Sequence, residues 1–302
     1  MDDYRNGLQV KKSCTINATV TKQISGAFPH AYELAQAGLE AANDTGSPEL
    51  FDTFFKPEER QIVVRSFKNI VKALTVKVKF PIAFFCNDPA KLCPIGTPAY
   101  HVDLYPYSNL APIHICPDVY LQLPEQVNAC DIASLNLAGK TDQNSHGHVI
   151  VHEMMHISFM SGKKRRTIDD CAFGGYAAHV MRTKTDKFGD LPGSLKPNCK
   201  QRDPSQNVDN FAMLAVWAWI RKEQQQLCPE HYPLWGMLEK IKEEKPSNDH
   251  SELRHLLSLG EGGGNTTLSD QQIRDAFNGT GMVDYVTLDS LGDGQVSEVE
   301  GP

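Results

Sequence analysis

The feature that most constrains this chain is His152-Glu153-Met154-Met155-His156, an HExxH motif in an apolar segment. The segment from Val149 to Met160 is predicted to be a buried helix. Residues i and i+4 share one face of a helix, so both imidazoles can bind a single zinc ion, and Glu153 can reach water bound to that ion. Burying three titratable side chains is costly unless they bind something. The motif therefore predicts a zinc site with Glu153 as general base.

The third zinc ligand decides the class of such a site. Metzincins continue the motif to a third histidine, but that position is Gly162 here. Gluzincins take a downstream glutamate, and no glutamate lies between residues 154 and 222. The remaining candidates are Asp169, Asp170 and His179. An aspartate is chemically sound because a carboxylate oxygen binds zinc well, but spacing alone leaves all three open.

Eight cysteines indicate the redox compartment. They are Cys14, Cys86, Cys93, Cys116, Cys130, Cys171, Cys199 and Cys228. No pair has CxxC spacing, so a zinc ribbon or a thioredoxin-type site is not expected, and the even number is typical of four disulfides in an exported protein. Glycosylation sequons that begin at Asn17, Asn43, Asn265 and Asn278 agree with export. The first residues have no apolar core and are not a signal peptide, so a cytosolic protein with reduced cysteines stays an alternative.

Composition excludes several other classes of protein. Hydrophobic residues make up 40 % and charged residues 22 % of the 302-residue chain, which is ordinary for a globular protein. No window approaches 18 uninterrupted apolar residues, so we expect no membrane span. A net charge of −7 argues against nucleic-acid binding. Residues 245–302 hold ten acidic and three basic residues, which predicts a flexible acidic tail.

Periodicity predicts a mainly α protein with a small β-sheet. Helical spacing of apolar residues covers 27–42, 51–74, 207–227 and 229–244, and strand-like segments cover 76–86, 99–102 and 113–116. Pro57 is expected to divide the second helical stretch or to start its second part at the first turn. Residues 1–13 are polar and are predicted to be flexible. We therefore expect one domain over 14–244, between a flexible start and the tail 245–302.

The ordered motifs resemble the deuterolysin-type fungal zinc endopeptidases, or aspzincins, a family that includes lysine-specific metalloendopeptidases. That family follows HExxH with GTxDxxYG, and this chain has Thr167-Ile168-Asp169-Asp170-Cys171-Ala172-Phe173-Gly174. Aligning the final aromatic-glycine pair implies Asp170 as the third zinc ligand. Residues 85–93, 99–100, 113–117 and 207–212 also resemble family segments, so the resemblance spans about residues 14–228. It implies a zincin-like α+β fold, with a small sheet over the active-site helix.

The resemblance also implies roles for residues outside the motif. The family tyrosine that helps to stabilise the oxyanion is Phe173 here, and Tyr176 is the nominated substitute. Asp209 matches an acid beside the pocket for the residue after the cut bond, whereas the second acid of the lysine-specific members is Ala212. This implies a broad preference for basic residues after the cut.

The family pattern further implies a disulfide connectivity. The implied pairs are Cys14–Cys86, Cys93–Cys116 and Cys130–Cys228, which leaves Cys171–Cys199.

We therefore expect a secreted zinc metalloendopeptidase with one Zn2+. Its partners are protein or peptide substrates, without nucleic acid or a membrane span, and we expect a monomer. The intact Glu153 favours this reading, since a purely structural zinc site has no use for a carboxylate base. The alternative is a non-catalytic zinc-binding secreted or cell-surface protein, which Phe173 favours because phenylalanine cannot donate a hydrogen bond.

Overall fold

A computed structural model describes the part of the chain that carries the motif and its surroundings. The described residues are 3–5, 8–15, 17–76, 82–93, 97–102, 110–127, 145–161, 168, 170–171, 178, 182 and 203–227. The predicted helix over 229–244 and the acidic tail over 245–302 lie outside these ranges.

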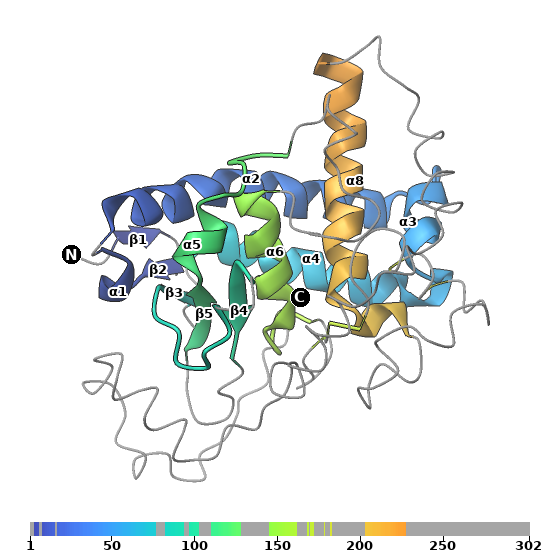
Figure 1. Ribbon diagram of the computed structural model, residues 1–302. Helices are drawn as coiled ribbons and strands as arrows, with labels where there is room; N and C mark the ends of the chain where they lie inside the picture. The colour runs from blue at the N-terminus through green and yellow to red at the C-terminus, as the bar shows by residue number, and fades with distance from the viewer. Residues whose placement is uncertain are drawn as a thin grey trace, which may run out of the picture.

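Four longer helices form the body of the molecule. They are α2 (Ala18–Asn43), α4 (Arg60–Thr75), α6 (His146–His156) and α8 (Val208–Leu227). The central helix α2 packs against the other three, and α6 also packs against α8 (Figure 1). The shorter helices are α1 (Lys12–Thr15), α3 (Glu49–Phe54), η1 (Pro57–Glu59), α5 (Pro117–Tyr120) and η7 (Pro204–Gln206).

Local sequence explains where two of these helices begin. The side chain of Asn17 accepts hydrogen bonds from the backbone N–H groups of Thr19 and Val20, so α2 begins at Ala18, well before the predicted start at residue 27. Pro57 begins η1 and separates α3 from α4, as the sequence predicted. Proline suits the first position of a helix because the N–H it lacks would have no partner there.

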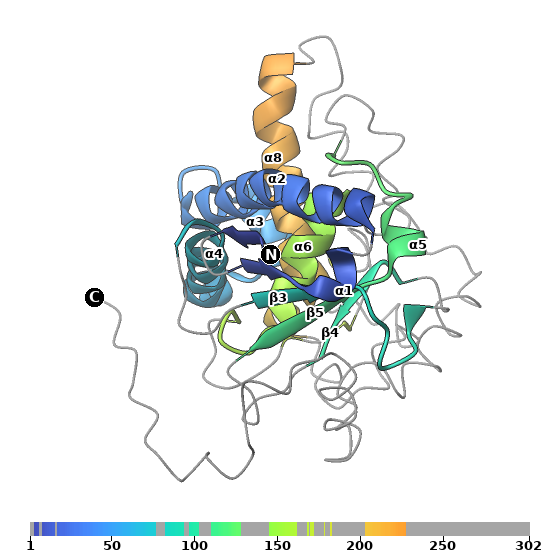
Figure 2. The same ribbon diagram turned by 90° about the vertical axis from the view of Figure 1, so that its left-hand side faces the viewer.

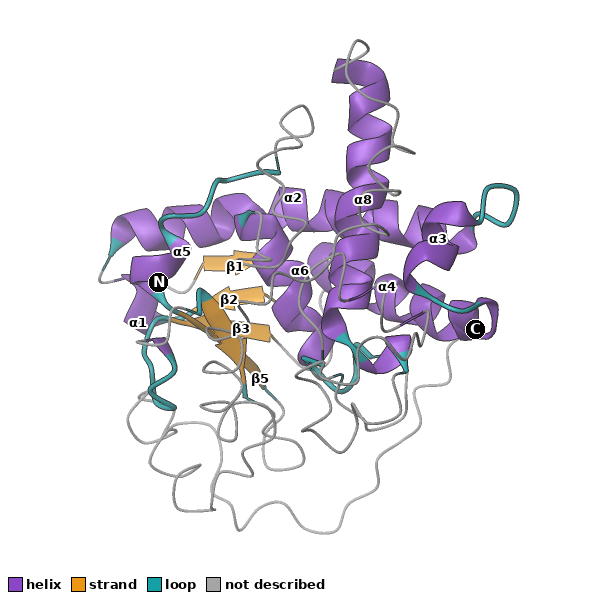
Figure 3. Ribbon diagram, turned by 45° about the vertical axis from the view of Figure 1, so that its right-hand side comes forward, coloured by secondary structure: helices purple, strands orange, loops and turns teal. Residues whose placement is uncertain are grey.

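A small mixed sheet lies beside α6. Its strands are β1 (Asp3–Arg5), β2 (Leu8–Val10), β3 (Ile82–Phe85), β4 (Ala99–His101) and β5 (Ala111–Ile115). The order is β1-β2-β3-β5-β4, with β2, β3 and β5 parallel and both outer strands antiparallel to their neighbours. Figure 2 shows β3, β5 and β4 beneath α2 and next to α6, and Figure 3 shows β1, β2, β3 and β5 below α2. The predicted mainly α fold with a small sheet is confirmed.

The prediction of a flexible start over residues 1–13 was wrong for the part that the structure describes. Leu8 and Val10 are buried at 1 % and 2 % exposure, and β2 pairs with β3 from Leu8↔Ile82 to Val10↔Phe84. Three residues are too short for a strand to be recognised from alternation alone, and the partner strand lies more than 70 residues away. Tertiary pairing therefore orders a segment that looks polar in isolation.

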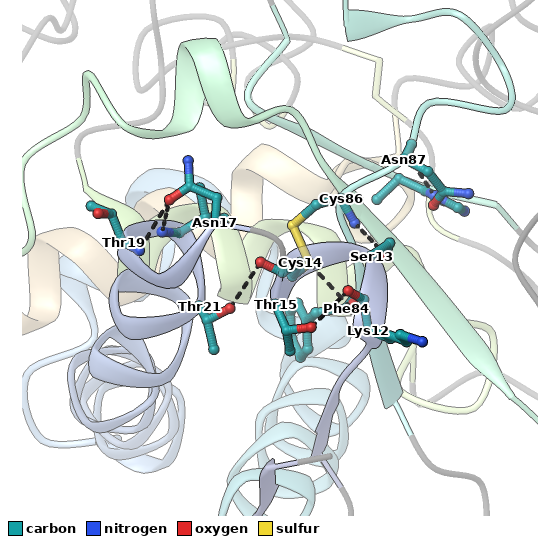
Figure 4. Close-up of a disulfide and its surroundings, with 12 residues drawn as sticks. Lys12, Ser13, Cys14, Thr15, Asn17, Thr19, Thr21, Phe84, Cys86 and Asn87 are labelled. Atoms are coloured by element: carbon teal, nitrogen blue, oxygen red, sulfur yellow. Dashed lines mark hydrogen bonds between the residues drawn. A yellow bond between two sulfur atoms is a disulfide. The ribbon is translucent and has the colours of Figure 1, made fainter. Parts of the chain in front are cut away.

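Two of the implied disulfides are present. Cys14–Cys86 joins α1 to the end of β3 across 72 residues, beside Ser13, whose hydroxyl accepts a hydrogen bond from the N–H of Cys86 (Figure 4). Cys93–Cys116 ties the loop after β3 to the end of β5. Cys171 is also disulfide-bonded. The implied partner Cys199 and the implied pair Cys130–Cys228 lie outside the described residues.

A single hydrophobic cluster joins the four longer helices to the sheet. Within the described ranges, no helix is long and apolar enough to cross a membrane.

Candidate metal centre

Helix α6 carries the HExxH motif in a buried setting. The side chain of Ser145 accepts a hydrogen bond from the N–H of His148 and so caps the helix start. His152 and Glu153 are each 2 % exposed. The helix ends at His156, and the apolar residues Ile157 and Met160 after it are also buried. The predicted buried helix over 149–160 is thus confirmed in type, although it begins earlier and ends sooner.

Asp170 lies against both motif histidines. Its Oδ1 is 3.1 Å from Nε2 of His152, and its Oδ2 is 3.2 Å from Nε2 of His156. One ligand atom from each of the three side chains lies within 4.8 Å of the other two. Asp170 is the one of the three open candidates that the structure describes, and it lies against the motif. Asp169 and His179 lie outside the described residues.

The opposite ring nitrogens of the two histidines are held by other groups. Nδ1 of His156 donates to the carbonyl oxygen of Ile168 at 2.7 Å, and Nδ1 of His152 lies 2.8 Å from Oδ1 of Asp209. A carbonyl only accepts, so a neutral His156 carries its proton on Nδ1 and presents a lone pair on Nε2. Contacts of this kind orient histidine ligands in metal sites. Both Nε2 atoms therefore face the same space as the Asp170 carboxylate.

The two histidines and Asp170 shift one another's pKa values. Burial opposes a charge on each ring, yet the Asp170 carboxylate raises the pKa of His156 and holds that of His152 well above its ordinary value. Burial likewise opposes the charge on Asp170, but the two histidines hold its pKa well below the usual range. The cluster therefore attracts positive charge between its members. A divalent cation there would take the place of the protons, which fits a two-histidine, one-aspartate donor set for zinc.

One carboxylate oxygen of Glu153 is available to hydrogen-bond a molecule in the site. Burial raises the pKa of Glu153, opposed by the charges of His152 and His156 and by a hydrogen bond from the backbone of His101. Among the described residues, Oε2 of Glu153 has no hydrogen-bond partner although it is buried. A buried carboxylate oxygen without a partner is costly, and a water molecule in the centre would satisfy it.

Asp209 lies at the start of the long helix, as predicted, and makes a contact there that the sequence did not predict. It lies in the first turn of α8, is 1 % exposed, and contacts a metal-site histidine. The resemblance implied a role for Asp209 in a substrate pocket for basic residues. Its contact with Nδ1 of His152 is of the kind that orients histidine ligands in metal sites.

Two residues near the centre, His101 and Asn207, were not predicted as site residues. A third residue, Tyr176, was predicted but is not described. His101 at the end of β4 donates from Nδ1 to the carbonyl of Pro112 at 2.7 Å, and burial lowers its pKa to about 3, so its ring is neutral beside the site. Asn207 accepts from the N–H of Cys171 at 2.8 Å. The available signal for Asn207 was its place in the segment 207–212, which resembles the deuterolysin pattern, whereas His101 lies outside the resembling segments. Tyr176 lies outside the described residues.

Part of this chain is similar in sequence to a curated protease. No family model matches the chain. Over 147 residues, which are 47 % of this chain, it is 27 % identical to the protein named neutral protease 2 homolog MEP5 of Coccidioides posadasii (strain C735). The aligned part covers 36 % of that protein's length, so the chain is similar to roughly a third of its relative.

Proposed function

We propose that this protein is a zinc-dependent endopeptidase of the deuterolysin type. The observation that carries the proposal is that Nε2 of His152 and Nε2 of His156 face the two oxygens of Asp170 while both Nδ1 atoms are engaged elsewhere. Similarity to a protein named as a neutral protease homolog supports a peptidase.

In this proposal the three side chains hold the metal and Glu153 moves protons. Bound zinc supplies a Lewis acid that polarises the scissile carbonyl and makes water more acidic. Glu153 takes the proton of the attacking water and later gives it to the leaving amine. Its raised pKa suits a group that must both accept and release that proton. Tyr176 is proposed as the donor to the oxyanion, in place of the tyrosine that Phe173 replaces.

Strand β4 is positioned to receive a peptide substrate. It is one of the two outer strands of the sheet, and in the described part of the chain it pairs only with β5. It packs against α6, and the backbone of its last residue, His101, hydrogen-bonds with the Glu153 carboxylate. An extended peptide that adds to this edge as a further strand would lie across the centre. A preference for basic residues after the cut stays a prediction, and we no longer assign it to Asp209.

We also propose that the protein acts outside the cell. The disulfides Cys14–Cys86 and Cys93–Cys116 are stable in an oxidising compartment and rare in a reducing one.

A non-catalytic zinc-binding role is the second candidate function, and Phe173 is the observation that favours it. Both candidates require zinc in the centre. They differ in whether Glu153 acts as a general base in the cleavage of a substrate.

One experiment separates the two candidates. The purified, oxidised full chain is assayed for zinc content and for cleavage of a denatured protein mixture, with and without a chelator. We expect one zinc per chain and cleavage that stops with the chelator and returns with added zinc. Glu153→Gln should keep the zinc and lose about 10²–10⁴-fold in cleavage rate.

Glu58→Gln is the matched control because Glu58 is an exposed glutamate in η1, a helix that carries none of the proposed site residues. It should cleave as the wild type does. Normal cleavage by Glu153→Gln contradicts the assignment of the base, and zinc binding without any cleavage by the wild type favours the non-catalytic role.

A further inference from the structure

We infer that Asn207 and Asn210 are positioning residues of the metal centre, which fix the segment of Asp170 to the start of α8. The inference rests on the proposed function. The described hydrogen bonds of the two side chains lead to other groups than the proposed metal ligands. The two asparagines act through a continuous series of hydrogen bonds between buried amide groups.

The series begins at the residue after the ligand. The backbone N–H of Cys171 donates to Oδ1 of Asn207 at 2.8 Å, and Nδ2 of Asn207 donates to Oδ1 of Asn210 at 2.7 Å. Nδ2 of Asn210 then donates to the carbonyl oxygens of Phe54 at 2.6 Å and Ala178 at 2.8 Å. Asn207 and Asn210 are both at 0 % exposure. Two side chains thus join the Asp170 segment, α8 and the end of α3.

Both ends of the series fix the orientation of its amides. A backbone N–H can only donate, so Asn207 must turn its oxygen toward Cys171 and its nitrogen toward Asn210. A backbone carbonyl can only accept, so Asn210 must turn its nitrogen toward Phe54 and Ala178. The two orientations are compatible, because Nδ2 of Asn207 then faces Oδ1 of Asn210. Reversing either amide would set oxygen against oxygen or N–H against N–H, so the series has one permitted arrangement.

The same end of α8 controls two ligands of the proposed site. Asn207 immediately precedes α8 and holds the backbone next to Asp170, whereas Asp209 lies in its first turn and contacts His152. A displacement of this helix end would therefore move Asp170 and His152 relative to each other. Metal affinity depends on the distance between Asp170 and His152, because both ligands must bind one ion at about 2.0–2.2 Å.

A purely structural role for the two asparagines makes a different prediction. Loss of buried hydrogen bonds lowers the free energy of unfolding wherever they lie. A positioning role additionally weakens metal binding in protein that is still folded. The decisive measurement is therefore zinc affinity, taken at a temperature where circular dichroism shows each variant to be fully folded.

The test compares Asn207→Ala with Asn69→Ala. Asn69 is the control because its side-chain amide also bridges elements, donating to the carbonyls of Phe159 and Met160, and these hydrogen bonds reach neither the Asp170 segment nor the start of α8. Competition with a chromophoric chelator should give about 10- to 100-fold weaker zinc binding for Asn207→Ala and wild-type binding for Asn69→Ala. The visible absorption of the Co2+-substituted protein should change for Asn207→Ala alone, because it reports ligand geometry.

Asn210→Ala covers the case in which Asn207→Ala does not fold. It removes the distant end of the series and leaves the bond from Cys171 to Asn207 available, so a smaller loss of zinc affinity in the same direction is expected. Cleavage by either variant should recover as buffered free zinc is raised, whereas cleavage by Glu153→Gln should not. Folded variants that bind zinc as tightly as the wild type, with an unchanged Co2+ spectrum, overturn the inference. A wild-type protein that binds no zinc overturns the proposed function itself, so the two failures are distinguishable.

Discussion

Oδ1 of Asp209 lies 2.8 Å from Nδ1 of His152, and both side chains are buried at 1 % and 3 % exposure. Asp209, in the first turn of α8, thereby places its carboxylate beside Nδ1, the ring nitrogen of His152 that does not face Asp170. A carboxylate in this position fixes the ring and makes its other nitrogen a better ligand. We therefore propose that Asp209 supports the proposed metal site.

Asp209→Asn should therefore weaken zinc binding by about 10- to 100-fold. The amide keeps an oxygen that can accept from the ring but lacks the negative charge. The cleavage pattern around basic residues should stay as in the wild type, which a mass-spectrometric cleavage profile can measure. Asp118→Asn, an exposed acid on α5, is the control. An altered preference after the cut bond together with unchanged zinc affinity would restore the predicted pocket role.

The sequence was sufficient for the parts of the site that depend on local geometry. His152 and His156 share a face because the helix repeat puts residues four apart together, and apolar neighbours predicted that the helix is buried. Asp170 followed from the resemblance to a known pattern, since spacing left Asp169 and His179 open. The implied pairs Cys14–Cys86 and Cys93–Cys116 had the same source.

The parts that could not be predicted depend on contacts between distant segments. Nothing near Asp209 in the sequence indicates that the start of α8 meets the side of His152 away from Asp170. The strand Leu8–Val10 exists because β3, far along the chain, pairs with it. The early start of α2 was open to local prediction, because Asn17 is a common capping residue.

A second prediction concerns pH. The N–H of Ser205 donates to Oε1 of Glu59 at 3.1 Å and to Oδ1 of Asp203 at 3.0 Å, so two carboxyl groups converge on one donor. Burial, together with the hydrogen bond to Asp203, raises the pKa of Glu59 from 4.5 to about 7. Between these pH values the folded protein holds more protons than the unfolded chain. The free energy of unfolding should therefore fall as pH rises from about 4.5 to about 7.

Urea unfolding of metal-free protein across this pH range tests the assignment. Glu59→Gln cannot titrate and should show a smaller decrease than the wild type. Glu58→Gln, at the exposed neighbouring position, should follow the wild type. Equal slopes for Glu59→Gln and the wild type would mean that folding does not raise the pKa of Glu59.

A third prediction concerns the close approach of α6 to α2. A Cβ atom at Gly147 would lie 2.6 Å from Cδ2 of His30 and 3.0 Å from the backbone nitrogen of Ala31. The backbone contact cannot be relieved by a side-chain rotation. Gly147→Ala should therefore lower the free energy of unfolding by about 1–3 kcal/mol, even though alanine favours a helix by about 1 kcal/mol.

Gly26→Ala is the control for this change. Gly26 lies inside α2, and a Cβ atom there would meet nothing within 4 Å. Chemical denaturation should show this variant to be as stable as the wild type or up to about 1 kcal/mol more stable. If Gly147→Ala is as stable as Gly26→Ala, the two helices can separate without cost.

The last prediction concerns the sequon at Asn17. Its Oδ1 caps α2 by accepting from the N–H groups of Thr19 and Val20, and its Nδ2 points away from the helix (Figure 4). Glycosylation uses Nδ2, so a glycan and the cap are compatible at this exposed residue. At the sequon of Asn43, by contrast, Nδ2 donates to the carbonyl of Leu39 at 3.0 Å. We therefore expect Asn17 to carry a glycan when the chain is expressed through a eukaryotic secretory pathway.

Two substitutions separate the glycan from the cap. Thr19→Ala destroys the sequon and keeps the capping oxygen of Asn17, whereas Asn17→Gln destroys both. Glycopeptide mass spectrometry should find the glycan in the wild type and in neither variant. In protein made without glycosylation, Asn17→Gln alone should lose about 1 kcal/mol of unfolding free energy, because its longer side chain does not cap well. An unmodified Asn17 peptide from secreted wild-type protein would contradict the predicted glycan, and equal stability of the two variants would contradict the role of the cap.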